Sequence, residues 1–283
     1  MVERKANCTN DEGSRSDIGK TQMRKGEQKG AMKNKKIVYS IGIFMLLGVW
    51  IYLFLVWNGI LWIKHPMKKE YPVTGIDVSH YQGDIEWEYV QEDLDITFAF
   101  IKATEGSGHV DKKFQENWTE AAKTDLYIGA YHFFSFDSKG KTQAENYIAT
   151  VSNVERMLPP VVDVEYYKNK ASNPPDVDKV RKELDVLLNM LEEKYGRKPI
   201  IYTTMSVYEK YINEYYNEYP LWIRNTYYRP FLVKNRQWLF WQYSEKGEWP
   251  YGTEQEKYVD CNVFAGSKET FLRYFGEGVD TKE

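Results

Sequence analysis

Cysteine is scarce in this 283-residue chain, which has only Cys8 and Cys261, on either side of a long uncharged apolar run. If that run crosses a membrane, the two cysteines lie on opposite sides of it and cannot pair. The part of the chain after the run then has no disulfide framework. Its stability must come from a hydrophobic core, which roughly 210 residues are enough to build.

Several common functional signatures are also missing. The chain has no G-x-S-x-G motif, no Gly-rich phosphate loop, and neither the H-E-x-x-H pattern nor the paired cysteines of a zinc site. These absences argue against a serine hydrolase, a nucleotide-binding loop and a zinc enzyme. A hard cation held by Asp and Glu oxygens is the remaining metal alternative. We expect no cofactor, no metal, no nucleic-acid partner and a monomeric protein.

The apolar run occupies residues 37–63, 27 positions without a formal charge. At about 1.5 Å per residue in a helix, it exceeds the roughly 30 Å hydrocarbon core of a bilayer. Trp57 and Trp62 near its end are typical of an interfacial aromatic belt. A cleaved signal peptide is the alternative, but the run is too long and no small-x-small cleavage site follows it. The sequence therefore predicts one transmembrane helix.

Flanking charge predicts the orientation of this helix. Positions 17–36 carry seven Lys or Arg residues, whereas 64–83 carry three. The positive-inside rule then places the N-terminus in the cytoplasm and everything after Ile63 outside, in a single-pass protein of the cell membrane. Residues 1–36 are expected to be a disordered basic tail. Residues 64–72 form a short stalk with a reach of about 30 Å, so the next domain is expected close to the outer leaflet.

Residues 73–276 alternate between strand and helix patterns and predict one domain, followed by a short tail at 277–283. Strands are expected at 73–79, 96–103, 127–134, 160–165, 199–203, 221–224, 238–243 and 258–263. Helices are expected at 85–94, 114–124, 141–154 and between Pro175 and Gly196. This alternation predicts a mostly parallel sheet. Eight strands suggest an α/β fold of the TIM-like barrel type in which the later helices are reduced.

Asp163 and Glu165 are the most informative residues. They follow the apolar run 158–162 with one residue between them. Side chains at i and i+2 of a strand leave the same face, so the two carboxylates point together. A protonated carboxylic acid beside an ionised one is what glycoside hydrolysis requires. A solvated pair at a strand end is the alternative. Asp77 and Asp260 lie on the first and last strands, which are neighbours in a closed barrel. Both side chains would then lie at the same open end of the barrel as the pair.

These motifs together resemble glycoside hydrolase family 25, the Chalaropsis-type muramidases. The similarity extends over about Tyr71 to Phe275. In chain order, the matching segments are GIDVSHYQG (75–83), IKATEG (101–106), GAYHF (129–133), DVE (163–165), LWI (221–223), WQY (241–243) and VDCN (259–262). Arg224 and Asn225 depart from the small residues usual in the family, which leaves the shape of the subsites open.

The resemblance implies a flattened β/α barrel that cleaves the β-1,4 bond between N-acetylmuramic acid and N-acetylglucosamine in peptidoglycan. Glu165 matches the general acid, and Asp163 matches the carboxylate that steers or stabilises the reacting face of the substrate. Asp77 and Asp260 match supporting acids. The expected substrate-binding side chains are Tyr131, Trp222, Tyr202, Gln242 and Glu105, the last with a simple ion pair to Lys102 as its alternative.

The chemistry of the residues agrees with these roles. Glu165 needs a pKa raised by burial and acidic neighbours, whereas Asp163 is expected nearer to solvent or to donors and ionised. We favour a substrate-assisted reaction in which Asp163 polarises the acetamido nitrogen. His80 and His132 are expected to be hydrogen-bonded structural residues.

The predicted function is a membrane-anchored muramidase that remodels or locally opens the cell wall. One alternative is a glycan-binding module that kept the fold and lost turnover, although the presence of all four acids argues against it. Another is a related hydrolase of a different N-acetylated glycan such as chitin. A released phage endolysin is disfavoured by the uncleaved anchor.

Overall fold

The computed structural model describes residues 35–55, 66–92, 94–232, 236–251 and 257–276. The chain divides into two compact units, Met1–Leu61 and Trp62–Glu283. In the first, Lys35–Leu55 is a 21-residue helix with a mean hydropathy of 2.2, long and apolar enough to cross a membrane. A signal sequence near the N-terminus has the same properties. The predicted tails at 1–36 and 277–283 (apart from residues 35 and 36), residues 56–63 of the span and residues 64 and 65 of the stalk lie outside the described residues.

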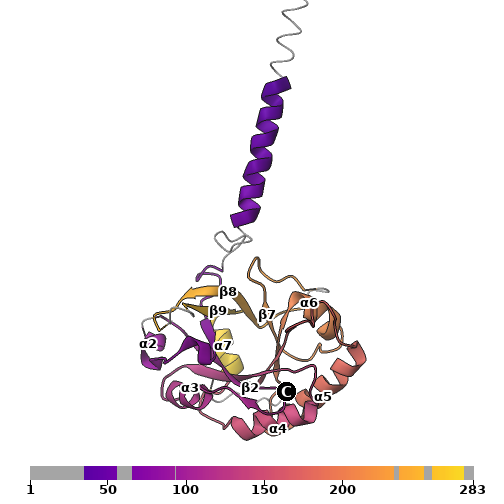
Figure 1. Cartoon of the computed structure of the whole chain (residues 1–283). Coiled ribbons are helices and arrows are strands. Elements are labelled where there is room, and N and C mark those ends of the chain that lie inside the picture. The colour runs from indigo at the N-terminus through magenta and orange to yellow at the C-terminus, as the bar shows by residue number, and fades with distance from the viewer. Residues whose placement is uncertain (1–34, 56–65, 93, 233–235, 252–256, 277–283) are drawn as a thin grey trace, which may run out of the picture. The chain divides into compact units, whose positions relative to one another are not determined.

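The second unit is built on a closed barrel of eight strands (Figure 1). The strands are β1 (Thr74–Val78), β2 (Phe98–Glu105), β4 (Tyr127–Phe133), β5 (Val161–Val164), β6 (Ile200–Thr204), β7 (Leu221–Arg224), β8 (Phe240–Glu248) and β9 (Tyr258–Phe264). From β1 through β2 and β4 to β8, each neighbouring pair is parallel. β9 closes the ring antiparallel to both β8 and β1. The two-residue β3 (His109–Val110) pairs with β2 outside the ring. The predicted TIM-like barrel is confirmed.

Most helices of the domain precede β6. α2 (Trp87–Glu92), α3 (Phe114–Ala121), α4 (Gly140–Thr150) and α5 (Val177–Tyr195) surround the early strands, after the short η1 (His80–Gln82). The connection from β6 to β7 holds the short α6 (Met205–Val207) and η2 (Tyr208–Ile212), and α7 (Lys268–Phe275) follows the last strand. Among the described residues no helix joins β7 to β8 or β8 to β9. The predicted reduction of the later helices is confirmed, whereas α7 was not expected.

Side chains alternate between the barrel interior and its outer wall. On β5, Val161 belongs to the interior cluster and Val162 to the outer core, so Asp163 faces inward again. The interior is filled by aromatic rings, with Phe100 stacked on Trp222 at 4.4 Å. Gly129 provides the necessary room, because a Cβ there would lie 2.5 Å from the ring of Phe100. These rings form an aromatic floor below the pocket, which polar side chains line at the carboxyl ends of the strands.

The wall formed by β7 and β8 has an irregular cover instead of a helix. Trp241 points outward from β8 and is nevertheless 2% exposed. The rings of Tyr71 and Trp238 pack on it at 6.1 and 5.9 Å. Its Nε1 donates to the carbonyl oxygen of Asn225 at 2.8 Å. The segment after β7 and the segment before β1 therefore cover this wall together.

Cys261 is the single cysteine of the described part of the chain, and it is a free thiol on β9. It is partly buried, with Sγ 3.7 Å from the carbonyl oxygen of Val259. Burial raises the pKa of this thiol to about 12, so it stays protonated at physiological pH.

Candidate active site

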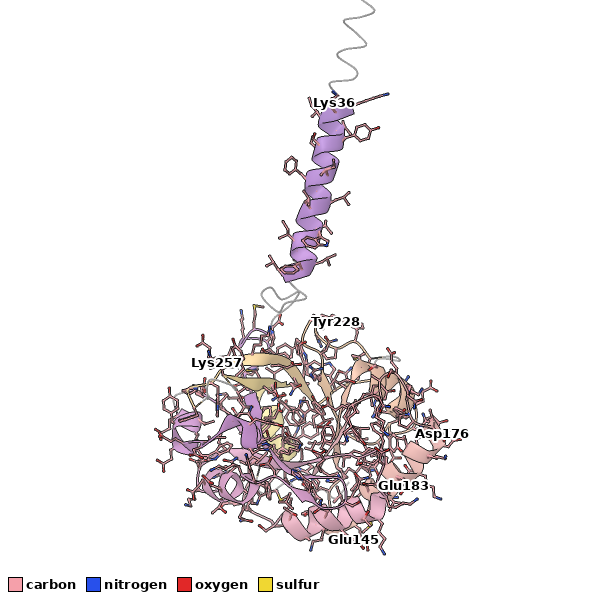
Figure 2. The ribbon with its side chains drawn as sticks, in the orientation of Figure 1. Lys36, Glu145, Asp176, Glu183, Tyr228 and Lys257 are labelled. Carbon is pink, nitrogen blue, oxygen red and sulfur yellow. The ribbon has the colours of Figure 1, made fainter. Side chains whose placement is uncertain are left out.

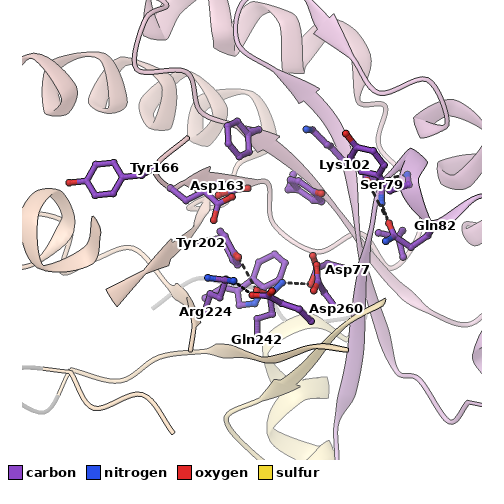
Figure 3. A pocket seen from close by; sticks show the side chains of 17 residues that line it. Asp77, Ser79, Gln82, Lys102, Asp163, Tyr166, Tyr202, Arg224, Gln242 and Asp260 are labelled. Carbon is purple, nitrogen blue, oxygen red and sulfur yellow. Dashed lines mark hydrogen bonds and ion pairs between the residues drawn. The ribbon is translucent and has the colours of Figure 1, made fainter. Parts of the chain in front are cut away.

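The four acids converge on one pocket of about 550 Å³ at the carboxyl ends of the barrel strands. Asp77 comes from β1, Asp163 from β5, Glu165 from the residue after β5, and Asp260 from β9. Figure 3 shows Asp77 beside Asp260, with Asp163 toward the other side of the pocket. The alternation of side chains along the strands produces this convergence, as the sequence predicted.

Two buried amide side chains hold the carboxylate of Asp77 in place. Its Oδ2 accepts from Gln242 Nε2 at 2.8 Å and from Asn262 Nδ2 at 2.7 Å. The Tyr202 hydroxyl donates to Gln242 Oε1 at 2.9 Å, and Trp222 Nε1 donates to Asn262 Oδ1 at 2.8 Å. Each amide therefore donates to Asp77 while it accepts from an aromatic side chain. This arrangement orients both amides and favours an ionised Asp77.

Asp77 and Asp260 share one proton at neutral pH. They are direct partners in the β1–β9 pairing, and their carboxyls are hydrogen-bonded. Burial and the charge of Asp77 raise the pKa of Asp260 to about 9. Burial also raises the pKa of Asp77 to about 6, against the hydrogen bonds that it accepts. Asp260 is therefore the protonated partner and donates to an ionised Asp77.

Asp163 is deeper than the sequence suggested. It is 7% exposed, and its Oδ1 is buried without a hydrogen bond from the described residues. Burial and the charge of Glu165 raise its pKa well above the ordinary value. The expectation that Asp163 lies nearer to solvent or donors is therefore wrong. Glu165 is the more accessible of the two, and burial raises its pKa as well, with Arg224 opposing.

The predicted substrate-binding residues separate into two groups. Tyr131, Trp222, Tyr202 and Gln242 all line the pocket. Glu105 is not among the lining residues, and its Oε2 accepts from Lys102 Nζ at 2.9 Å. Lys102 itself lines the pocket, so the ion-pair alternative for Glu105 describes its position better.

Arg224 and Glu245 form an ion pair among the lining residues that was not assigned to the site from sequence. Arg224 follows Trp222 by two positions on β7, so the inward face of that strand could have been extended to it. Glu245 gave no such signal, because the β8–β9 register shifts on both sides of Ser244. Other lining residues outside the prediction are Val78, Ser79, Tyr81, Gln82, Phe133 and Tyr166.

The two histidines near the rim are hydrogen-bonded, as expected. His132 is buried, with ring nitrogens 2.7 Å from Thr104 Oγ1 and 3.1 Å from Gln143 Oε1. Burial lowers its pKa to about 4, so it is neutral. His80 Nδ1 lies 2.6 Å from Asp111 Oδ2. Within the described ranges, no group of three or more His, Cys, Asp or Glu residues is arranged to hold a metal ion.

Comparisons with known proteins agree with this geometry. Residues 76–251 match the family model for glycosyl hydrolases family 25. Lysozyme M1 of Streptomyces globisporus is 31% identical over 71% of this chain and 70% of its own. A family 25 glycosyl hydrolase from Bacillus anthracis is 49% identical, with a TM-score of 0.69 over 75% of this chain and 96% of its own. A Streptomyces coelicolor lysozyme is 31% identical, with a TM-score of 0.64 over 72% and 97%. The chain therefore belongs to glycosyl hydrolase family 25 and is a glycoside hydrolase.

Proposed function

We propose that this protein is a membrane-anchored muramidase that cleaves the β-1,4 bond from N-acetylmuramic acid to N-acetylglucosamine in peptidoglycan. The observation that carries this proposal is the buried Oδ1 of Asp163 beside Glu165, which accepts no hydrogen bond from the described part of the chain. An acceptor without a donor fits a substrate that brings its own N–H, and the 2-acetamido group of an N-acetylated sugar has one. The relatives named lysozyme support peptidoglycan as the substrate.

The reaction uses the substrate's acetamido group as its nucleophile. Glu165 gives its proton to the glycosidic oxygen as the bond from this oxygen to C1 breaks. The acetamido carbonyl oxygen attacks C1 from the opposite face, while Asp163 Oδ1 takes the N–H proton and so increases the nucleophilicity of that oxygen. Water then opens the cyclic intermediate at C1: its oxygen bonds to C1 with one hydrogen, its other proton goes to Glu165, and Asp163 returns the proton it took to the acetamido nitrogen. The anomeric configuration is retained.

Substrate binding also places the catalytic proton. In the free site, burial and the charge of Glu165 favour a proton on Asp163, whose Oδ1 accepts no hydrogen bond from the residues that the structure describes. An N–H from the substrate stabilises the ionised form of Asp163. The proton of the pair then resides on Glu165, where the leaving oxygen needs it. Glu165 is therefore protonated, and able to act as the general acid, only when an N-acetylated sugar is bound.

The other acids organise the charge of the site. Ionised Asp77, held by two amides and by protonated Asp260, faces the positive charge that develops at the sugar ring in the transition state. Burial and nearby carboxylates raise the pKa values of Tyr131 and Tyr202 well above the ordinary value. Their hydroxyls therefore stay protonated, and the one on Tyr131 is placed to donate to substrate.

The helix Lys35–Leu55 is proposed to anchor this domain at the cell membrane. The excess of Lys and Arg before the helix supports a cytoplasmic N-terminus and a barrel outside. The proposed domain boundaries are those predicted from the sequence: the span at 37–63, the stalk at 64–72 and the barrel at 73–276. Protease shaving of intact cells tests the orientation, because an outside barrel is lost and an inside barrel is protected.

The catalytic proposal is tested with the full-length chain in detergent micelles on purified peptidoglycan. New reducing ends are reduced with borohydride and identified by mass spectrometry. The parent is expected to produce reduced N-acetylmuramic acid. Glu165→Gln and Asp163→Asn are expected to lose activity about 10²–10⁴-fold, since each removes a proton transfer. Glu183→Gln, the same kind of change at the α4–α5 contact, is the matched control.

Three results would contradict the proposal. Reduced N-acetylglucosamine at the new ends would exclude a muramidase. Full activity of Asp163→Asn, or inverted product, would exclude the assisted route. Binding without new ends would indicate the glycan-binding alternative.

A further inference from the structure

The wall of the barrel without a helix has an unusual concentration of exposed aromatic side chains. Phe231 is 83% exposed, the highest value among the exposed large hydrophobic residues of the described chain. Tyr227 and Tyr228 are 41% and 45% exposed, and Met67 is 57% exposed. Together with Arg229 we call these residues the aromatic flank. Scattered exposed hydrophobic residues are normal in proteins, but a cluster of them needs an explanation.

The two segments that carry the flank are connected through Trp238 and Tyr71. Trp238 Nε1 donates to the carbonyl oxygen of Pro230 at 3.2 Å, and the guanidinium of Arg229 lies 5.8 Å from the Trp238 ring. Tyr71 packs on the same ring at 6.0 Å. The amide of Tyr71 donates to the carbonyl oxygen of Met67 at 2.9 Å. The loop after β7 and the entrance of the chain into the domain are therefore side by side.

The loop is built to present its aromatic residues outward. The amides of Tyr227 and Tyr228 both approach Asn225 Oδ1, at 3.1 and 3.4 Å, in an Asx turn that fixes the backbone. Pro230 is buried, which fixes the loop just before Phe231. Residues 225–232 contain one positive charge and no negative charge. Figure 2 shows Tyr228 at the outer edge of the barrel domain.

We propose that the aromatic flank docks on the outer interface of the bilayer. This inference rests on the proposed anchor, because it needs the chain to enter the domain from a membrane. The described part of the domain begins at Pro66, next to Met67 of the flank, and the predicted stalk 64–72 would reach about 30 Å even if it were fully extended. The flank therefore includes, in Met67, one of the first described residues of the domain after the proposed span.

The chemistry of the flank suits a lipid interface better than an aqueous surface. Aromatic rings concentrate at the headgroup level of membranes, where one side is apolar and the other wet. Arg229 and the exposed Lys69 add positive charge, which anionic headgroups attract. The flank covers the side wall of the barrel, whereas the pocket opens at its carboxyl end. Docking through this wall therefore leaves the mouth of the pocket uncovered, so that substrate can still enter it.

The test is a depth measurement with spin labels on the full-length chain in anionic lipid vesicles. Labels are placed singly on introduced cysteines after Cys8→Ser and Cys261→Ala. The three positions are Tyr228 in the flank, Leu47 in the apolar helix and Glu145 on α4. Relaxation by oxygen, which concentrates in lipid, is compared with relaxation by a water-soluble nickel complex.

Docking predicts that the labels at positions 47 and 228 lose accessibility to nickel, while the label at 145 keeps it. A lipid-immersed label at 47 with a water-exposed label at 228 would overturn docking but not the anchor. The aromatic residues would then be available for a protein partner. A water-exposed label at 47 would overturn the anchor, and docking with it.

Two variants test which side chains are responsible. With the label at 228, Phe231→Ser is expected to reduce the docked fraction relative to the free one roughly tenfold, because a large apolar side chain returns to water. Leu272→Ser removes a 51% exposed apolar side chain from α7 and is the matched control, with no change expected. Equal effects of the two substitutions would contradict a specific role for the flank.

Discussion

The Asp260→Asn substitution is expected to stabilise the barrel domain at neutral pH while it preserves the hydrogen bond to Asp77. The reason is the pKa of Asp260, which rises from 3.8 to about 9 on folding, chiefly through burial. Between these values the unfolded chain has lost the proton that the folded domain retains. The stability of the parent must therefore decrease as the pH rises from about 4 to about 9.

The magnitude follows from the width of this window. A pKa shift of one unit corresponds to about 1.4 kcal/mol, so the roughly three units between 3.8 and pH 7 cost the parent about 4 kcal/mol. An asparagine avoids this cost, since its amide donates to Asp77 without taking up a proton. For a domain of about 210 residues, 4 kcal/mol corresponds to roughly 10 °C in Tm.

The assay is urea unfolding of the isolated barrel domain from pH 4 to pH 9, with parent and variant in parallel. Use of the isolated domain is justified by the Bacillus anthracis relative, because 75% of this chain covers 96% of that one. The difference in free energy of unfolding should be small at pH 4 and grow in favour of the variant as the pH rises. Glu218→Gln is a control of opposite sign, since Lys198 lowers the pKa of Glu218. A difference between Asp260→Asn and parent that is independent of pH, or a less stable variant at pH 7, would refute the reasoning.

Two further substitutions test the floor and the mouth of the pocket. Gly129→Ala places a Cβ 2.5 Å from the Phe100 ring, so it is expected to lower the free energy of unfolding by about 1–3 kcal/mol, measurable by urea titration; an unchanged midpoint would contradict the tight packing. Arg224→Gln removes a positive charge that lowers the pKa of Glu165, so this pKa should rise. The alkaline limb of the pH profile of kcat/KM, where the general acid loses its proton, should then move to higher pH. A limb that moves to lower pH would mean that Arg224 acts on another group.

Most of the barrel could be predicted because its strands are short apolar runs with clear ends. The strand predicted at 221–224 has the same bounds in the structure. β8 continues to Glu248 instead of ending at Tyr243, because pairing with β9, rather than apolar character, makes its polar second half a strand. The helix α7 was missed although its signals were present, with Ser267 as N-cap and Phe271 and Phe275 on its buried face.

The site could be predicted as a set of acids, but not their protonation states. Strand alternation was enough to bring Asp163 and Glu165 into one pocket. The depth of Asp163 depends on how the whole barrel packs around it, and this is not encoded in a local pattern. Glu105 was placed at the site by resemblance; it is not among the lining residues, and it pairs with Lys102 just after the shift of the β2–β4 register between Lys102 and Thr104.

The protonated thiol of Cys261 has a consequence for how the domain matures. A thiol whose pKa is about 12 is a poor nucleophile at physiological pH, so it resists both mixed disulfides and stepwise oxidation. The barrel needs no oxidative folding catalyst, because it has no second cysteine with which Cys261 could pair while it folds. Its activity should be indifferent to the redox potential around it, with or without reductant.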